Sequence, residues 1–332
     1  MQLPMMARVD VFSRRRQRAA CADDEDRLSD LPDDLLLHIL RRVNTRTALG
    51  AAGVSRHWAS LTRELPALDL KVTDILTPRY YRLRLLRYDA REWKIRSTLA
   101  DRRRLDCITG RYERRAMVRS VKRLLASRAR ARRRVERLSL EVFAYDASSC
   151  INRLVVDAVD SWGVRDPEVV ATPTGPLAYP DHPPPYSFPR GLISRNPRES
   201  RLRSLKLAHC LPPPLQGFTT LTTLVLRDLS ASTSASAYEG AVAACPQLQV
   251  LHLVSCELTS RADRIVLDAP MSEIRELLLD GQYMVVELRS LPKLESLTIL
   301  HTEMVLCSTA AAPCLAREPD LLRWPAGKSS RL

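Results

Sequence analysis

One apolar pattern repeats along the C-terminal half of this 332-residue chain, and it restricts the possible folds more than any other feature. The pattern is L-x-x-L-x-L, and the position eight residues after its first residue is usually a Cys, an Asn or a small or apolar residue. Alternating apolar residues over so short a span predict a strand with one buried face. One such strand cannot bury its leucines alone, so successive copies are expected to stack into a curved parallel sheet.

Five copies fit this pattern closely and two fit it more weakly. Their first residues lie 19 to 38 residues apart, in or near the range of leucine-rich repeats. Chance clustering of leucine would not keep five copies in phase. We therefore predict about seven repeats over residues 135–314, with short outer strands at Ile265–Leu267 and Val285–Val286. The close copies begin at Leu202, Leu221, Leu248, Ile274 and Leu294, and the weaker ones at Val135 and Val164.

In this register, offsets 2, 4 and 6 of each repeat face the concave side of the sheet. The central repeats place valine and leucine at these offsets, bordered by charged residues. An apolar centre with a charged edge is typical of a surface that binds a protein partner. The alternative is that a loop or the C-terminal tail covers this surface. The candidate binding residues are Val225, Arg227, Val250, His252, Val254 and Leu278.

The stretch from Asp26 to Leu70 has the pattern of short helices. Pro32 suits a first helical position, and Ser29 and Asp30 before it are good capping residues. Apolar side chains then recur at helical spacing and form one wide stripe. The residues of this stripe are Leu35, Leu36, Ile39 and Leu40.

A second helix is expected to begin at Thr45 or Thr47, either of which can cap it, and to continue through Trp58. Gly50 and Gly53 each cost a helix about 1 kcal/mol relative to Ala, so this helix is predicted to be short or broken. The whole stretch carries more apolar side chains than about 45 residues bury among themselves. The surplus indicates a face that another protein covers.

This stretch resembles the F-box, the small helical module that docks on a Skp-family adaptor of cullin-based ubiquitin ligases. The likeness rests on the order D-R-L-S-x-L-P-D-x-L-L, then S-x-x-W, then L-P-x-L-D, which is that of the plant version. The alternative is an ordinary helical hairpin packed on its own chain. The resemblance implies that the following residues contact the adaptor or support that contact: Leu31, Pro32, Leu35, Ile39, Val54, Ser55 and Trp58.

A strongly basic region follows at residues 71–134. From Arg79 to Arg137 the chain has 22 Lys or Arg residues against 6 Asp or Glu residues. Within this region, Met117, Val121 and Leu124 keep helical spacing, which predicts an amphipathic basic helix. We interpret it as a linker helix whose apolar stripe covers the first repeat. The alternatives are contact with an acidic substrate, a nuclear-import signal and nonspecific binding of nucleic acid.

Three further segments interrupt or flank these units. Residues 1–25, with a basic cluster at Arg14–Arg18, are expected to form a disordered arm. Residues 173–189 contain seven prolines, which predicts a surface loop between two repeats, with recognition by a proline-binding domain as the alternative. Residues 315–332 leave the repeat pattern and are expected to form an irregular tail.

The composition and the motifs argue against a membrane protein, a secreted protein, an enzyme and a metalloprotein. No run of 18 uncharged apolar residues occurs, and the N-terminal segment lacks the apolar core of a signal peptide. The eight cysteines include no C-x-x-C pair, which favours reduced thiols in the cytosol or nucleus. No G-x-S-x-G, P-loop or dinucleotide-binding glycine motif occurs. We expect no catalytic residue, no cofactor and no metal site.

The two halves together resemble the plant F-box/leucine-rich-repeat proteins of the cereal type, as in the phrase AVAACPQLQVLHLVSC. The resemblance implies an α+β chain in which a helical F-box at residues 26–70 precedes the basic linker and a curved leucine-rich-repeat α/β solenoid. It also implies a substrate-recognition subunit of an SCF-type cullin E3 ubiquitin ligase, located in the nucleus, the cytoplasm or both. The implied partners are a Skp-family adaptor, a cullin bound through it, and an unknown protein substrate. The alternative is a basic repeat scaffold with a nonfunctional F-box that binds acidic partners or nucleic acid, the latter being the less expected ligand.

Overall fold

The computed structural model describes most of the chain between residues 31 and 323. The predicted N-terminal arm, most of the proline-rich segment and most of the C-terminal tail lie outside the described residues, as do the expected caps Ser29 and Asp30. The described residues are 31–76, 78–91, 99–128, 135–143, 149–172, 186–187, 199–229, 233–258, 260, 262–281, 284–306 and 322–323.

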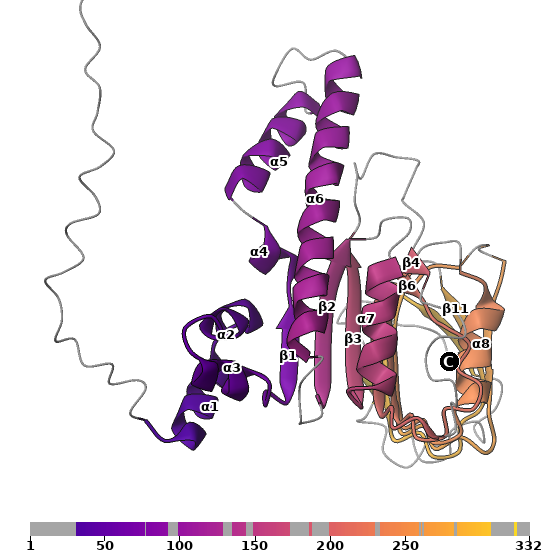
Figure 1. Ribbon diagram of the computed structural model, residues 1–332. Coiled ribbons are helices and arrows are strands. Elements are labelled where there is room, and N and C mark those ends of the chain that lie inside the picture. Colours follow the sequence, from indigo (N-terminus) through magenta and orange to yellow (C-terminus); the bar gives the residue numbers. More distant parts are fainter. Residues whose placement is uncertain are drawn as a thin grey trace, which may run out of the picture.

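Three short helices come first in the described chain (Figure 1): α1 (Asp33–Arg42), α2 (Thr45–Ala51) and α3 (Arg56–Thr62). α1 follows Pro32 directly and has acidic residues in its first turn and basic residues in its last, as the helix dipole favours. The predicted second helix is divided, because a turn containing Gly53 separates α2 from α3. The expected caps of α2 were wrong. Asn44 has the extended backbone of a cap, and its side chain accepts a hydrogen bond from the Thr47 amide at 2.8 Å.

A nine-stranded sheet follows, in the order β1-β2-β3-β5-β7-β8-β10-β12-β14. All of its strand pairs are parallel. Each copy of the leucine pattern contributes one strand, which begins two residues after the first residue of the copy. The strands are β1 (Ala67–Leu70), β2 (Arg137–Phe143), β3 (Asp166–Thr172), β5 (Ser204–Ala208), β7 (Thr223–Arg227), β8 (Val250–Val254), β10 (Glu276–Asp280), β12 (Ser296–Leu300) and β14 (Leu322–Arg323).

The first strand belongs to the sheet although it lies inside the predicted helical unit. The segment Leu65–Leu70 reads LPALDL and so has the same L-x-x-L-x-L form as the repeats. Leu68 and Leu70 are buried like the leucines of the other strands, and β1 pairs with β2 along its whole length. The boundary expected after residue 70 therefore falls at the end of a strand that joins the helical unit to the sheet.

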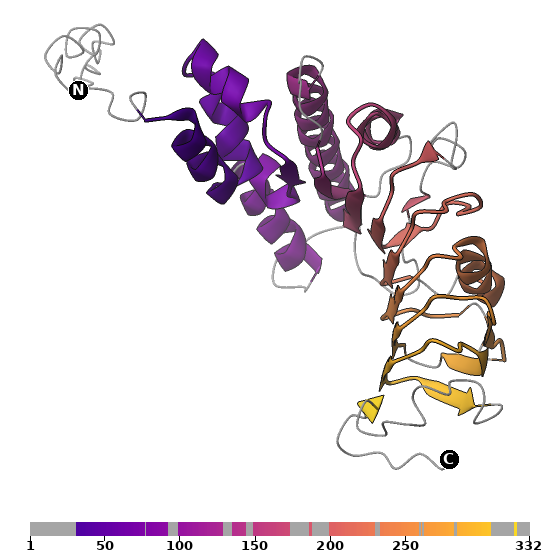
Figure 2. The ribbon, with the colours of Figure 1, turned by 90° about the horizontal axis from the view of Figure 1, so that it is seen from below.

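Helices and a second sheet cover the outer side of the main sheet, which bends so that its strands line the inner side (Figure 2). The two helices are α7 (Ser149–Asp160) and α8 (Ala235–Ala244). The predicted outer strands are present and join a third in a parallel sheet of order β13-β11-β9. The core lies between these layers. The outer strands are β9 (Ile265–Asp268), β11 (Val285–Ser290) and β13 (Glu303–Leu306).

The basic region is folded into α4 (Val72–Ile75), α5 (Pro78–Arg91) and α6 (Leu99–Arg128), and the last two extend beyond the ends of the strands (Figure 1). α6 packs against β2 and α7, and α5 packs against α6. Met117, Val121 and Leu124 are buried, as the apolar stripe predicted. The Tyr80 hydroxyl donates a hydrogen bond to the Glu113 carboxylate at 2.6 Å. These helices therefore share the core, with the apolar stripe of α6 packed toward the strand of the first repeat.

Two short strands lie in segments that were expected to be irregular. β4 (Tyr186–Ser187), in the proline-rich segment, pairs with β6 (Cys210–Leu211). The ring of Tyr186 is buried, and its amide donates a hydrogen bond to the His209 carbonyl at 2.9 Å. β14, in the predicted tail, pairs with β12. Pairing with a neighbouring strand thus gives both short segments a defined backbone.

Candidate functional site

The helix α1 divides its apolar side chains between the core and the solvent. Leu36 and Leu40 of the predicted stripe are buried together with Leu37. Leu35 and Ile39, one turn apart, are instead 51% and 38% exposed. A leucine and an isoleucine on the same exposed helix face are a ready contact for another protein.

The turn between α2 and α3 adds a third exposed apolar side chain. Val54 is 72% exposed, and its amide donates a hydrogen bond to the Ala51 carbonyl at 2.9 Å. The next residue, Ser55, is exposed and caps α3 by accepting a hydrogen bond from the Trp58 amide at 3.2 Å. The ring of Trp58 is buried in the core. Val54 is therefore available to a partner, whereas Trp58 holds the helix that positions it.

The start of α1 is fixed by its neighbours. Leu31 is half-buried against the core, while Pro32 is exposed, and the Pro32 carbonyl accepts hydrogen bonds from the amides of Leu35 and Leu36. The His57 ring bonds the Asp33 carboxylate at 2.7 Å and so connects α3 to α1. Of the seven predicted adaptor residues, five are exposed and two support the face from behind.

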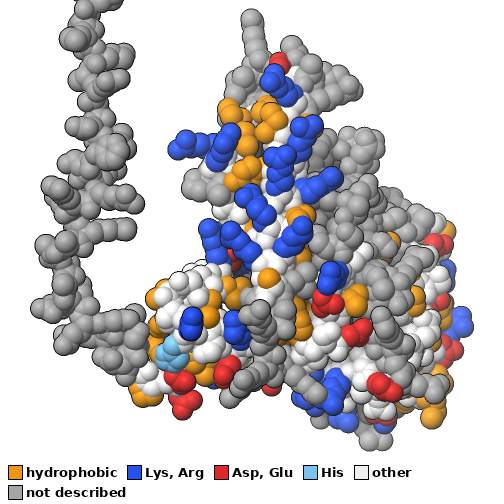
Figure 3. Space-filling view, viewed as in Figure 1, with side chains coloured by type: hydrophobic (Ala, Val, Ile, Leu, Met, Phe, Trp, Pro, Cys, Tyr) orange, Lys and Arg blue, Asp and Glu red, His pale blue; other side chains and the backbone are white. Residues whose placement is uncertain are grey.

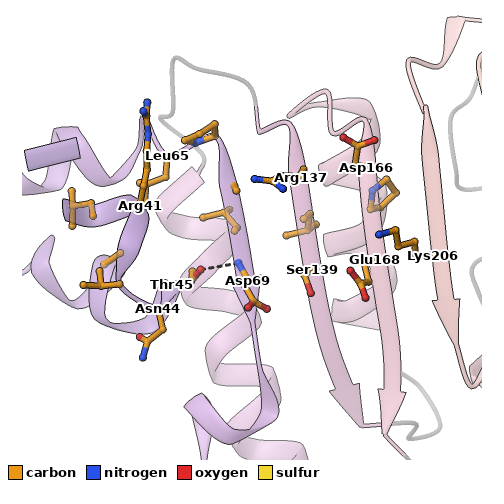
Figure 4. Close-up of a pocket in the computed structure, with 18 of the residues that line it drawn as sticks. Arg41, Asn44, Thr45, Leu65, Asp69, Arg137, Ser139, Asp166, Glu168 and Lys206 are labelled. Atoms are coloured by element: carbon orange, nitrogen blue, oxygen red, sulfur yellow. Dashed lines mark hydrogen bonds between the residues drawn. The ribbon is translucent and has the colours of Figure 1, made fainter. Parts of the chain in front are cut away.

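A cavity of about 720 Å³ lies between these helices and the inner face of the first strands (Figure 4). Helix residues such as Arg41 and Asn44 line one side, and residues of β1, β2, β3 and β5 line the other. The repeat register predicts that the polar residues of β2, β3 and β5 face the concave side, but it does not predict the cavity. The LPALDL segment was the available signal, since it brings a strand, and with it the sheet, directly against the helices.

Charged and polar side chains of both signs line the cavity. In the strand register Asp69 lies beside Ser139, which lies beside Glu168, which lies beside Lys206. Two residues earlier, Arg137 lies beside Asp166. None of Arg137, Asp166, Glu168 and Lys206 pairs with a described residue, so these groups are available to a ligand.

Asp69 is held at the edge of this cavity by local contacts. Its amide donates a hydrogen bond to Thr45 Oγ1 at 2.7 Å, and its Oδ2 lies 3.1 Å from Lys71 Nζ. The hydrogen bond to Asp69 and the charge of this carboxylate raise the pKa of Lys71. Asp69 Oδ1 is buried and has no hydrogen-bond partner among the described residues. The cavity therefore combines fixed charges with one unsatisfied acceptor.

The six predicted concave-face residues lie together on three adjoining strands, β7, β8 and β10. Their exposure differs from what the pattern indicated. Val225 lies beside His252 in the register but is buried, whereas Arg227 is exposed. His252 bonds the Glu276 carboxylate at 2.8 Å. The partly exposed apolar part of this face is confined to Val250, Val254 and Leu278.

The described residues offer no arrangement for metal binding. No group of three or more His, Cys, Asp or Glu side chains among them could hold a metal ion. Cys107, Cys210, Cys245 and Cys256 are free thiols, and all but Cys107 are buried. None of the described helices is long and apolar enough to cross a membrane.

Comparison with known proteins identifies the helical unit. Residues 28–68 match the family model of the F-box domain, which confirms the predicted module. An FBD-associated F-box protein of Arabidopsis thaliana is 40% identical over 67 residues, which are 20% of this chain and 15% of the relative. An F-box/FBD/LRR-repeat protein of the same plant is 47% identical over 47 residues, which are 14% of this chain and 10% of the relative. F-box/LRR-repeat protein 13 of this plant is 35% identical over 66 residues, which are 20% of this chain and 15% of the relative.

These similarities cover the F-box region and not the sheet. The match spans at most 15% of the length of each of these relatives. The F-box domain is therefore shown for residues 28–68, and the sheet carries no comparable assignment.

Proposed function

We propose that the F-box domain at residues 28–68 makes this chain a substrate-recognition subunit of an SCF-type cullin E3 ubiquitin ligase. In this proposal the F-box docks on a Skp-family adaptor, and through it on a cullin, while the sheet binds a protein substrate. The observation that carries it is the F-box match over helices that leave Leu35, Ile39 and Val54 exposed. Full burial of a Val, Leu or Ile side chain contributes about 1.5–3 kcal/mol, and the still exposed part of each of these three can contribute a share of that to an interface.

The sheet fits the architecture of a leucine-rich-repeat solenoid. Seven strands lie within copies of the L-x-x-L-x-L pattern, and the segment LPALDL at residues 65–70 contains an eighth strand, β1. We assign residues 135–314 to the repeats, residues 71–134 to the basic helical layer, and residues 26–70 to the F-box with the first strand. The arm at residues 1–25, the proline-rich loop and the tail complete the proposed organisation.

Two parts of the inner face are candidates for substrate contact. One is the cavity beside the F-box, with its unpaired charges. The other is the patch of Val250, Val254 and Leu278, edged by Arg227 and His252. A protein held at either place needs no chemistry from this subunit, because a receptor of this kind accelerates transfer by holding the substrate near the reactive thioester of another subunit. We accordingly propose a non-catalytic role, in the nucleus, the cytoplasm or both.

The proposal is tested by copurification of the full chain with a Skp-family adaptor. The double substitution Leu35→Asp and Val54→Asp introduces charge at two exposed positions, so the fold is expected to persist while adaptor recovery falls at least tenfold. Trp58→Ala is a poorer test because Trp58 is buried and its loss destabilises the helices. Met271→Asp, at a side chain that is 86% exposed and lies outside the F-box, is the matched control. Adaptor recovery that is unchanged in the double variant would contradict the proposal.

A second candidate function is a scaffold that binds nucleic acid or acidic partners through its basic surface, with a nonfunctional F-box. The row of exposed Lys and Arg side chains on α6 favours it. The same variants discriminate the two functions when binding is measured at moderate and at high salt. Retention of RNA or DNA that is lost at high salt and unaffected by Leu35→Asp with Val54→Asp would support the scaffold.

A further inference from the structure

The outer face of α6 carries a straight row of positive charges. Arg104, Arg111, Arg115 and Lys122 are seven, four and seven residues apart, spacings that return to the same side of a helix. All four are exposed. With a rise of about 1.5 Å per residue, the row extends over about 27 Å. The opposite side of the helix holds the buried stripe that packs on the sheet.

The charges of this row are not neutralised by described neighbours. None of the four side chains forms an ion pair with a described residue. Glu113, the nearest acidic side chain in the same turn, is buried and accepts the hydrogen bond of Tyr80. A row of uncompensated cations attracts a partner that carries negative charge.

Apolar side chains accompany the positive row. Ile108 on α6, and Tyr81, Leu85 and Leu86 on α5, are large hydrophobic residues that remain exposed. Figure 3 shows hydrophobic side chains gathered over α5 and α6 and bordered by Lys and Arg. Exposed apolar groups in such a cluster favour burial against another surface.

We propose that the face formed by α5 and α6 binds an acidic peptide segment that also carries apolar side chains. Carboxylates of the segment pair with Arg104, Arg111, Arg115 and Lys122, and its apolar side chains cover Leu85 and Ile108. This face lies where α5 and α6 extend beyond the ends of the strands, and its residues are other than Leu35, Ile39 and Val54 of the F-box.

The apolar component favours a peptide over a nucleic acid. A phosphate backbone neutralises cations but offers nothing to exposed leucine or isoleucine. Base stacking would require a series of exposed aromatic rings, and Tyr81 is the only exposed one among the described tyrosines of this layer, because Tyr80 is buried and stacks on Tyr112 with ring centres 6.1 Å apart. A protein segment with both acidic and apolar side chains matches both parts of the face.

The experiment is a fluorescence-anisotropy titration of the full chain with three labelled probes of equal length. The first is a peptide with the repeat Glu-Glu-Leu-Leu, the second a peptide with the repeat Glu-Glu-Ser-Ser, and the third an oligouridine RNA. The charge variant combines Arg111→Glu, Arg115→Glu and Lys122→Glu. The control combines Arg201→Glu, Arg203→Glu and Arg264→Glu, three exposed arginines that precede strands β5 and β9, with the same change in net charge. The apolar variant combines Leu85→Ser and Ile108→Ser.

We expect the first peptide to bind at least tenfold more tightly than the second. The charge variant should bind the first peptide more than tenfold more weakly than the unaltered chain, while the affinity of the control variant for this peptide should change less than twofold. The apolar variant should weaken the first peptide three- to tenfold and leave the second unchanged. Circular-dichroism melting verifies that each variant is folded.

Three results would overturn the proposal. One is RNA that binds as tightly as the first peptide, which would assign the face to nucleic acid. Another is an equal loss of affinity for the first peptide in the charge variant and in the control variant, which would mean nonspecific attraction to net charge. The third is the absence of binding by either peptide at low salt.

Discussion

Burial determines the chemistry of the described cysteines. Desolvation raises the pKa of the Cys210 thiol to about 12 and those of Cys245 and Cys256 to about 11. Cys210 and Cys256 also donate weak hydrogen bonds to carbonyls of neighbouring strands, Val169 at 3.6 Å and Leu226 at 3.5 Å. The thiols of Cys210 and Cys256 thus act as small core groups that connect neighbouring strands. The last position of the leucine pattern therefore accommodates a Cys.

Thiol alkylation will therefore distinguish the four cysteines. At pH 8, a thiol with a pKa near 11 is ionised to about one part in a thousand, so Cys245 and Cys256 should react with iodoacetamide only on unfolding. Cys107 is exposed and should react in the native protein. Mass-spectrometric peptide mapping after timed labelling measures both. Native labelling of Cys256 at the rate of Cys107 would contradict this account.

The same pKa shifts give a sign for the pH dependence of stability. The folded state keeps the buried thiols protonated, whereas the unfolded chain ionises its thiols near pH 8.5. Their contribution is complete below that pH and is lost as pH rises toward 11. The melting temperature should accordingly fall over this interval.

At the scale of the elements, one turn recurs at the ends of the strands. His209, Asp228, Ser255 and His301 each follow a strand directly and have positive φ angles near 50°. After β10 the same position is Gly281, which does not have a positive φ angle; there the constraint is space, because an added Cβ would lie 2.5 Å from the Cys256 carbonyl oxygen. The left-handed conformation costs an ordinary residue about 1–2 kcal/mol, so packing of the neighbouring strands must enforce it.

Substitutions at Ser255 measure this cost. Ser255 is exposed and has a φ of 51°, so Ser255→Gly is expected to be more stable than Ser255→Val by about 1–2 kcal/mol in chemical unfolding. Ser296, in the extended strand β12, is the control, because there valine should be preferred over glycine. If the glycine variant were also more stable than the valine variant at Ser296, backbone strain at Ser255 would be ruled out as the cause.

At the scale of the whole molecule, the F-box and the sheet share one hydrogen-bonded framework. The Pro66 carbonyl accepts hydrogen bonds from the amides of Glu136 and Arg137 at 2.7 and 3.2 Å. The carbonyl of Glu136 accepts from Arg165 at 3.0 Å, and the same step is repeated from strand to strand as far as Glu295. This ladder fixes the orientation of the exposed F-box face relative to the inner face of the sheet. A substrate receptor needs such a fixed geometry.

Thr45→Val tests the connection between the two parts. It removes the acceptor of the Asp69 amide, so the free energy of unfolding should fall by about 1–2 kcal/mol and hydrogen exchange at Asp69 should accelerate. Thr47→Val is the control, since the Thr47 side chain is exposed and its amide keeps the Asn44 cap. Equal exchange at Asp69 in both variants would show that this hydrogen bond does not hold the junction.

Residue order was enough to predict most of the local elements. Leucine spacing located the seven central strands, and the order of residues around Leu31-Pro32 and Trp58 identified the F-box, because periodicity and capping act over only a few residues. The order of residues could not show which apolar side chain of a helix is buried and which is exposed. Leu35 and Leu36 are equally apolar, yet only the packing of α1 against α3 exposes the first and buries the second.

The way in which the F-box and the sheet meet depends on long-range contacts. The strand at Ala67–Leu70, the burial of Val225 and the cavity beside the F-box all depend on partners far away in the chain. The folding of the basic region into a packed layer likewise depends on β2 and α7. Local patterns specify which residues are apolar, but the side on which each is buried is set by the surfaces that cover it.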